Sequence, residues 1–481
     1  MTAVTGYDMM KWYRRNGPSF FERQAKLEEI TDKNLEMAHR IAVMVSAAGG
    51  RAYFVGGFVR DQILNRPSKD IDLEIHGISP QVLQDILEQC GERTVQGAAF
   101  PVYGIRHYDI DIAMPRVSDC SGASVAAPFI GTEKAALRRD LTINALMQDV
   151  LSGEILDYFG GLGDLKNGVL RHVNPQTFSE DPLRVLRTAQ FAARFHFRIS
   201  EDTIALCSTL NVSELPKERV LVEVQKAFQK GERPSVFFEA LREMNQLHTW
   251  FPELEALIGV PQDPEHHPEG DAWTHTMLVF DAAASLHGVT KNPTGLMFSA
   301  LCHDFGKAVT TQMFNGHYHA YRHEIEGIPL AKQFIQRLTD EIDLKRYVSN
   351  MVALHMRPNM LVSQNSGRKA MMRLFDEAFS PEDLLLLSKA DRMGQLRWED
   401  CEKKEAILRQ YLEEYHQLLK RPSVQGADLI AAGFEPGPEL GAALKYARKL
   451  HLSGVKKKQA LKATISYLKK RKADGLPAET D

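Results

Sequence analysis

Hydrophobic and polar positions divide the chain into an N-terminal part of mixed character and a longer helical part. The segment RAYFVGGFVRDQILN has the pattern of a short strand, a Gly-Gly turn and a helix, and DIDLEIHG and YDIDIAMP alternate as strands do. Residues 79–89 have a helical pattern between such strands. These segments predict an α+β unit, a small mixed sheet with helices, in roughly the first 150 residues.

After about residue 159 the 3.6-residue period dominates, as in PLRVLRTAQFAARF, RVLVEVQKAFQK, SVFFEALREMNQL and EAILRQYLEEYHQLLK. No convincing strand pattern follows, so the remainder is predicted to be all-α. Loops at 259–271 and 421–426 have the composition of boundaries. The expected parts are a head, a helical neck, a third helical domain and a helical tail, at 1–160, 161–258, 259–400 and 401–481.

Composition narrows the class of protein. Of 481 residues, 44% are apolar and 25% charged, which is typical of a folded protein of about three domains. Five scattered cysteines without a CxxC pair indicate neither a disulfide framework nor a thiolate zinc site. The N-terminus has no apolar signal segment, and no run of about 18 apolar residues occurs. We therefore expect a cytoplasmic protein.

The charge distribution singles out the C-terminal end. Residues 445–472 hold eleven basic residues and no acidic one, although the net charge of the chain is -3. Such a stretch can bind a polyanion or can form a solvated helical face. Charge alone leaves both interpretations open.

Two carboxylates on one predicted strand are the first candidate for chemistry. Asp70 and Asp72 are two residues apart, so they point to the same face while their neighbours face the core. Paired carboxylates can hold divalent cations that assist phosphoryl transfer. A third carboxylate can come from Asp111 on YDIDIAMP, and Asp109 competes for that role.

The glycine pair Gly56-Gly57 lies upstream, where backbone can approach phosphate. This GGxVRD followed by DxD resembles the polymerase β superfamily of nucleotidyltransferases, in particular the bacterial CCA-adding enzymes and poly(A) polymerases. RRDLTINA at 138–145 is similar to the family's RRDxTxNA, DYFGGLGDL at 157–165 to its hinge segment, and EDPLRVLR at 180–187 to its base-selecting helix. The resemblance implies nucleotide binding by residues of these motifs, namely Gly56, Gly57, Arg60, Arg139, Asp140, Asn144, Asp181, Arg184 and Arg187.

The base-selecting motif has a physical rationale of its own. Asp181 and Arg184 are three positions apart and lie on one helical face. A carboxylate accepts from an exocyclic amine, and a guanidinium donates to an unprotonated ring nitrogen. Cytosine and adenine present this pair of groups side by side, whereas uracil and guanine reverse them. The pair is expected to accept C and A.

Histidines and aspartates form a second constellation, of which HD at 303–304 is the centre. Imidazole and carboxylate ligands suit Mn, Fe, Co, Ni or Zn, and also Mg. The spacing resembles the H…HD…H…H…D pattern of HD-superfamily phosphohydrolases, with Lys307 available for phosphate. The resemblance implies a metal site made of His275, His303, Asp304, His323, His355 and Asp391.

Together these resemblances imply template-independent addition of CCA to tRNA from CTP and ATP, with Mg²⁺ held by Asp70 and Asp72 and with Asp111 as a third catalytic carboxylate. An HD domain behind such a head implies hydrolysis of 2′,3′-cyclic or terminal phosphate at damaged RNA ends. GADLI and GFEPGPELG before the basic stretch resemble the family's C-terminal segment, which favours RNA phosphates as its partner. The expected RNA-binding residues are Lys456, Lys457, Lys458 and Lys462.

Three alternatives stay open. The first is a poly(A) polymerase. Such enzymes of this family carry a GRRF-like basic segment after the DxD strand, whereas residues 95–100 here read VQGAAF, without those arginines. The linker at 116–138, where the family keeps a loop needed to switch from C to A, is short, so CC-only or A-only addition is a second alternative. The third is a chain that acts mainly as an HD phosphohydrolase, with an RNA-binding head.

Overall fold

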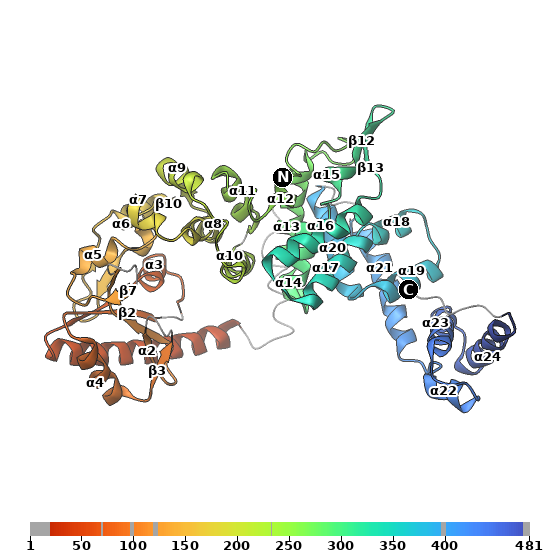
Figure 1. Ribbon diagram of the computed structural model, residues 1–481, viewed down its shortest axis with the longest axis horizontal. Coiled ribbons are helices and arrows are strands. Elements are labelled where there is room, and N and C mark those ends of the chain that lie inside the picture. Colours follow the sequence, from red (N-terminus) through yellow and green to blue (C-terminus); the bar gives the residue numbers. More distant parts are fainter. Residues whose placement is uncertain are drawn as a thin grey trace. The chain divides into compact units, whose positions relative to one another are not determined.

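The computed structural model describes residues 20–68, 71–96, 101–118, 124–231, 233–395 and 401–474. The chain divides into two compact units, Met1–Asn211 and Val212–Asp481, and each is described by itself. Figure 1 shows a sheet with helices around it in the first unit and a largely helical second unit. The expected α+β head followed by a helical remainder is confirmed.

The first unit is built on a seven-stranded mixed sheet of order β3-β4-β5-β2-β1-β8-β9. In this sheet β2 and β5 run parallel, and the other neighbouring strands run antiparallel. Ile71, Leu73 and Ile75 of β2 are at most 1% exposed, which buries one face of the sheet. The strands are β1 (Arg51–Val55), β2 (Ile71–His76), β3 (Arg93–Gln96), β4 (Val102–Ile105), β5 (Ile110–Ala113), β8 (Met147–Asp149) and β9 (Ile155–Leu156).

Helices cover this sheet and continue beyond it. The long helix α2 packs on β1, β2 and α4 through Ala38, Ile41 and Val45, all buried. Two short strand pairs stand apart from the main sheet, β6 (Arg116–Ser118) with β7 (Ser124–Ala126) and β10 (Val169–Leu170) with β11 (Arg198–Ile199). The helices are α2 (Phe20–Ala47), α3 (Gly57–Ile63), α4 (Pro80–Cys90), α5 (Thr132–Ala136), η1 (Thr142–Asn144), α6 (Gly161–Asn167), α7 (Pro175–Ser179), α8 (Leu183–Phe195) and α9 (Glu201–Thr209).

The second unit packs its helices around a core rich in phenylalanine, including Phe280, Phe298 and Phe334. Its first helices are α10 (Lys217–Lys230), α11 (Ser235–Glu243), α12 (Pro252–Glu255), α13 (Ala272–Ser285), η2 (His287–Val289), α14 (Pro293–Cys302), α15 (Lys307–Thr310), α16 (His323–Leu338) and α17 (Ile342–Leu354). They are followed by α18 (Arg357–Ser363), α19 (Arg368–Glu377), α20 (Pro381–Gly394), α21 (Cys401–Leu419), α22 (Gly426–Ala431), α23 (Pro438–Leu452) and α24 (Lys457–Asp474).

One hairpin interrupts the helices of the second unit, where the sequence pattern gave no convincing strand. It consists of β12 (Thr311–Phe314) and β13 (His317–Ala320). Three of the four β12 residues are exposed, so the strand has no apolar alternation. The Asn315-Gly316 pair between the strands is a strong hairpin signal that periodicity does not use.

The four-part division of the chain stays a prediction; the boundary between the two units, after Asn211, falls within the range expected for the neck. The loop at 259–271 lies between helices α12 and α13, and the segment 421–426 ends at Gly426, the first residue of α22. No helix in the described ranges has the length and apolarity that crossing a bilayer requires.

Candidate active sites

The first candidate site lies where β2 and β5 run side by side. Asp72 and Asp111 are register partners on these parallel strands, so their side chains share one face. Neighbouring strands lie about 4.8 Å apart, which lets both carboxylates serve the same cation. Asp109 precedes β5, and its backbone N–H donates to Asn34 Oδ1 at 3.3 Å. Asp70, the other predicted ligand, lies outside the described residues.

Gly56 brings bare backbone to this carboxylate site. It precedes α3 with a φ of 63°, a conformation that glycine adopts without strain. A Cβ atom at Gly56 would lie 3.6 Å from Asp72 Oδ2 and 3.8 Å from Arg139 Nη1. The glycine turn, the Asp72 carboxylate and the Arg139 guanidinium therefore lie together. A metal-bound triphosphate requires these three kinds of group.

Glu74 holds Arg139 at this point. Its Oε2 pairs with Arg139 Nη2 at 2.6 Å, and its Oε1 with His76 Nε2 at 2.9 Å. Burial alone would raise the pKa of Glu74, but Arg139 and His76 outweigh it and lower the pKa. Sequence reasoning missed Glu74, although it follows Asp72 by two residues on the same strand face.

A buried chain of polar groups joins three of the predicted motifs. Arg60 Nη1 donates to Asn144 Oδ1 at 2.5 Å, Asn144 Nδ2 to Asp140 Oδ1 at 2.9 Å, and Arg187 Nε to Asp140 Oδ2 at 2.8 Å. Burial opposes ionisation of Asp140, yet Arg187 and the hydrogen bond from Asn144 lower its pKa to about 2. Arg60 is only 2% exposed, so it faces this chain rather than solvent.

The two residues of the predicted base selector lie at the start of α8. Asp181 Oδ1 accepts from the backbone N–H of Leu183 at 3.1 Å. Arg184 donates from Nη1 to the carbonyl of Thr177 and from Nη2 to that of Arg138, both at 2.7 Å. These bonds use two of the five N–H donors of the guanidinium, so Arg184 can read a base through a further N–H on Nε, Nη1 or Nη2.

The hinge segment is locked onto the RRDxTxNA segment. Asp157 accepts from the backbone N–H groups of Gly161 and Leu162 at 2.8 and 3.0 Å. Gly161 lies so close to Thr142 that a Cβ would stand 2.3 Å from its carbonyl oxygen. Asp164 Oδ2 accepts from Thr142 Oγ1 at 2.7 Å. Only glycine permits this approach between the two segments.

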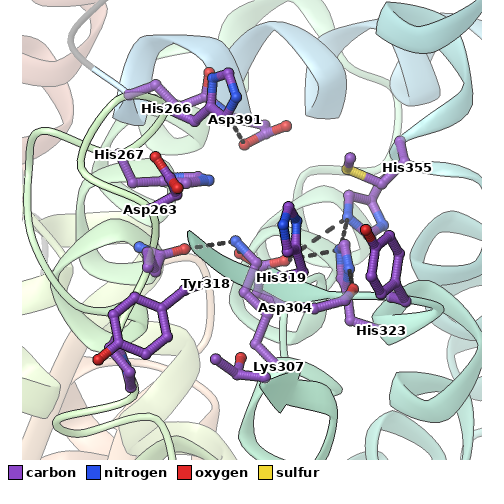
Figure 2. Close-up of a pocket in the computed structure, with 17 residues that line it drawn as sticks. Asp263, His266, His267, Asp304, Lys307, Tyr318, His319, His323, His355 and Asp391 are labelled. Atoms are coloured by element: carbon purple, nitrogen blue, oxygen red, sulfur yellow. Dashed lines mark hydrogen bonds and ion pairs between the residues drawn. The ribbon is translucent and has the colours of Figure 1, made fainter. Parts of the chain in front are cut away.

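The second candidate site is a cluster of buried histidines and aspartates in the helical unit. Figure 2 shows Asp304, His323, His355 and Asp391 turned toward one pocket. Asp304 Oδ2 lies 3.1 Å from His303 Nε2, and its Oδ1 lies 3.3 Å from His323 Nε2. All six predicted ligands are brought together and at most 5% exposed, namely His275, His303, Asp304, His323, His355 and Asp391.

Hydrogen bonds fix the orientation of the four imidazoles. His303 and His355 directly follow α14 and α17, where the last turn of a helix leaves carbonyls without an intrahelical partner. Every Nδ1 has an oxygen acceptor: Ala300 O for His303 at 2.7 Å, Ala320 O for His323 at 2.8 Å, Val352 O for His355 at 2.7 Å, and Glu269 Oε1 for His275 at 2.8 Å. Such contacts place the proton on Nδ1 and leave Nε2 as a ligand.

The Nε2 atoms then face one another in two pairs. His275 and His303 are 3.3 Å apart at Nε2, and so are His323 and His355. Two nitrogen lone pairs at this distance repel unless a positive charge lies beside them. The donor atoms of His275, His303 and Asp391 lie within 4.8 Å of one another, as do those of Asp304, His323 and His355. The donor set fits divalent cations.

Electrostatics supports this fit. Burial disfavours a charged His275, but Asp391 and Glu269 outweigh it and raise its pKa to about 9. Burial lowers the pKa of His355 to about 3, and nearby His323 adds to this effect. The cluster thus stabilises positive charge near His275, and a metal ion can take the place of a proton there.

The pocket over the cluster has a volume of about 210 Å³. Lys307 Nζ lies 2.7 Å from Asp304 Oδ2 and donates to Gln262 Oε1 at 2.6 Å. The loop at 259–271 also contributes His267, whose Nδ1 shares Glu269 with His275. Sequence reasoning interpreted this loop as a boundary and missed His267 and Glu269.

Replacing Glu269 with Gln is expected to weaken metal binding by about 10- to 100-fold, because a carboxylate behind a ligating histidine raises its basicity and fixes its ring. Calorimetric titration of the full chain with Mn²⁺ measures this effect. Glu265→Gln in the same loop, at an exposed position, is the control. Equal Mn²⁺ affinity in wild type and Glu269→Gln would contradict the assignment of Glu269.

The predicted RNA-binding lysines lie around the start of α24. Lys457 pairs with Asp428 at 2.9 Å, whereas Lys456, Lys458 and Lys462 are exposed. Helices α22, α23 and α24 share their own apolar core, which includes Leu429, Ala443, Ala460 and Leu468. The tail thus presents basic side chains on a folded support.

Three family descriptions match successive parts of the chain. Residues 52–171 match the poly A polymerase head domain, and residues 196–258 match the probable RNA and SrmB-binding site of polymerase A. Residues 272–393 match the HD domain. The first match contains Gly56, Asp72, Asp111 and Arg139, and the third contains the six clustered histidines and aspartates.

Curated relatives extend this similarity over most of the chain. The chain is 38% identical over 403 residues to the multifunctional CCA protein of Actinobacillus pleuropneumoniae serotype 5b, covering 80% of this chain and 94% of that protein. It is 36% identical over 407 residues to the protein of that name from Mannheimia succiniciproducens, covering 80% and 93%.

Solved structures share the fold. The Thermotoga maritima CCA-adding enzyme complexed with tRNA is 18% identical with a TM-score of 0.60, and the match covers 90% of this chain and 95% of that one. A CCA-adding enzyme complexed with ATP gives a TM-score of 0.63 at 18% identity, with coverages of 91% and 96%. Given the order of these domains and the identity to curated relatives, the chain belongs to the multifunctional CCA proteins, a family of nucleotidyltransferases with a poly(A) polymerase head and an HD domain.

Proposed function

We propose that the head adds the nucleotides C, C and A to the 3′ end of tRNA, using CTP and ATP and no template. The observation that carries this proposal is the register pairing of Asp72 with Asp111 beside Gly56 and Arg139. Relatives that bear the name multifunctional CCA protein, and fold neighbours solved with ATP, CTP or tRNA, support it.

Asp72 and Asp111, with Asp70, would hold Mg²⁺. When bound, Mg²⁺ supplies a lowered pKa for the 3′-hydroxyl and neutralises triphosphate charge. Arg139, held by Glu74, binds the triphosphate next to the backbone of Gly56.

The remaining nucleotide-binding residues divide into two groups. Asp181 and Arg184 select the base through its amine and ring nitrogen. Arg60, Asp140, Asn144 and Arg187 act as one buried chain that fixes the ribose and triphosphate contacts.

One incubation distinguishes this activity from its alternatives. A tRNA transcript that ends before CCA is given CTP alone, ATP alone, or both. We expect two added residues with CTP and three with both nucleotides. A product with at most two added C residues would instead indicate CC-only addition, and a single added A would indicate A-only addition. A long A tract would indicate a poly(A) polymerase.

For the second site we propose metal-dependent phosphohydrolysis at RNA ends, including 2′,3′-cyclic phosphates. The six buried ligands suit Ni, Mn, Co or Fe, or Mg. When bound, such a metal supplies a nucleophile by lowering the pKa of water. Lys307 lines the pocket and pairs with Asp304; a metal ion bound by Asp304 would leave the ammonium group of Lys307 to attract the phosphate of the substrate.

The tail supplies affinity for RNA without reading sequence. Lys456, Lys458 and Lys462 are exposed on the side of the folded C-terminal helices, where they can contact phosphates. Lys457 contributes less, because Asp428 already neutralises it. Because the proposed substrate is tRNA, we also infer that the protein works in the cytoplasm.

A further inference from the structure

An exposed row of aromatic rings stands beside the histidine–aspartate pocket. It consists of Phe314, His317, His319 and Tyr321, on and just after the β12–β13 hairpin, and we call it the aromatic row. Phe314 is 61% exposed and Tyr321 is 70% exposed. Large apolar side chains grouped in this way on a surface indicate a binding site.

The rings of the aromatic row lie on one side of the hairpin. His317, His319 and Tyr321 alternate along the chain, and Phe314 is the cross-strand partner of His317. His319 and Tyr321 stack with ring centroids 5.1 Å apart and an interplanar angle of 14°. The ring centroids of Phe314 and of His317 each lie 6.5 Å from that of His319.

The aromatic row is connected to the pocket through His317 and through its last two rings. His317 Nδ1 pairs with the buried carboxylate of Asp263 at 2.7 Å, which ties the hairpin to the loop at 259–271. His319 and Tyr321 themselves line the pocket. His323, one of the clustered histidines, lines the same pocket, and Figure 2 labels it together with His319. The row therefore leads from the surface to the metal ligands.

Flat rings with faces open to solvent are the feature by which proteins bind unpaired nucleotides, because every base has a face that can stack. A duplex would keep its bases stacked on one another and leave these rings uncovered. The pocket of about 210 Å³ is small enough for one terminal group rather than a helix end. Lys307 lines the pocket and would complement a phosphate once a metal ion shares its partner Asp304.

We propose that the aromatic row binds the unpaired 3′-terminal nucleotides of an RNA by stacking, and thereby places the terminal phosphate over the histidine–aspartate cluster. The inference rests on the proposed phosphohydrolase function and names its substrate class. It makes Tyr321 and His319 specificity residues of the second site, without a role in the chemical step.

The test compares two substrates of the Mn²⁺-loaded full chain: a single-stranded RNA that ends in a 2′,3′-cyclic phosphate, and glycerol-1,2-cyclic phosphate, which has no base. Tyr321→Ala is expected to raise KM for the RNA about tenfold and to leave KM for the base-free ester within about twofold. Tyr321→Phe keeps the ring and is expected to restore the wild-type KM. Phe379→Ala removes an aromatic side chain that is 59% exposed and is the matched control.

Binding gives a second measurement that needs no turnover. A 2-aminopurine base at the 3′ end of the same RNA should lose fluorescence on binding wild type and Tyr321→Phe, but much less with Tyr321→Ala. The cyclic phosphate keeps this RNA from serving as a primer in the head.

The outcomes separate the two proposals. Hydrolysis by wild type with unchanged KM and quenching in Tyr321→Ala would overturn the stacking role. Equal affinity for a blunt-ended duplex and for the single-stranded RNA, measured by competition, would overturn it as well. Quenching that depends on Tyr321, in a wild-type protein without hydrolysis, would support the aromatic row and refute the proposed phosphohydrolase.

Discussion

Asp72→Asn is expected to lower the rate of nucleotide addition to tRNA by about a thousandfold or more. The substitution keeps the shape of the side chain but removes the negative charge that a divalent cation needs at β2, and metal stabilisation of transferred phosphate is worth several kcal/mol. Single-turnover addition of radiolabelled CMP, with CTP and Mg²⁺ in excess, measures the chemical step. The circular dichroism spectrum and tRNA affinity should stay at wild-type values.

The neighbouring strand offers a matched pair of controls. Asp111→Asn should cause a loss of similar order, because Asp111 is the register partner of Asp72. Asp109→Asn should change the rate by less than about threefold, because Asp109 lies before β5. Near wild-type extension by Asp72→Asn would sink the carboxylate assignment, and a large loss only in Asp109→Asn would exchange the roles of the two residues.

Asp304→Asn is expected to lower hydrolysis of a 2′,3′-cyclic phosphate by at least about a hundredfold while nucleotide addition stays unchanged. Asp304 contacts both histidine groups, through Oδ2 to His303 and Oδ1 to His323, so the amide removes a shared charge from the centre of the cluster. Chromatographic separation of the ring-opened phosphomonoester from the cyclic phosphate, with added Ni²⁺ or Mn²⁺, and CMP incorporation on the same preparation measure the two activities.

The exposed aspartate Asp340, which pairs with Lys217, provides the control substitution Asp340→Asn. His303→Ala should reproduce the loss in Asp304→Asn. Hydrolysis that persists in both variants would mean that the activity arises elsewhere, and parallel loss of CMP incorporation would point to misfolding instead.

Local sequence patterns predicted the elements that carry the first site. The strand, glycine turn and helix at 51–63 are present, and so is the strand that carries Asp72. Alternation predicted which residues share a face, because the strand period is fixed by geometry. What alternation lacks is the identity of the neighbouring strand, so only the register of β2 with β5 favours Asp111 over Asp109.

Residues that act through other side chains were harder to predict. In the sequence, Glu74 and Glu269 look like ordinary acidic residues. Their pairing with Arg139 and His275 becomes visible only in three dimensions. The bonds of Arg184 to two backbone carbonyls likewise have no trace in the sequence. The six metal-ligand candidates could be predicted because they match the spacing of the HD motif in the sequence. That they lie together depends on long-range packing, which only the structure shows.

Three of the four clustered imidazoles are oriented by peptide carbonyls rather than by side chains. A backbone carbonyl is present whatever amino acid stands at positions 300, 320 and 352. Substitutions at these positions therefore leave the orientation of the three rings unchanged. Of the four, His275 alone takes its orientation from another side chain, Glu269, so position 269 is the one at which a substitution would turn a ring.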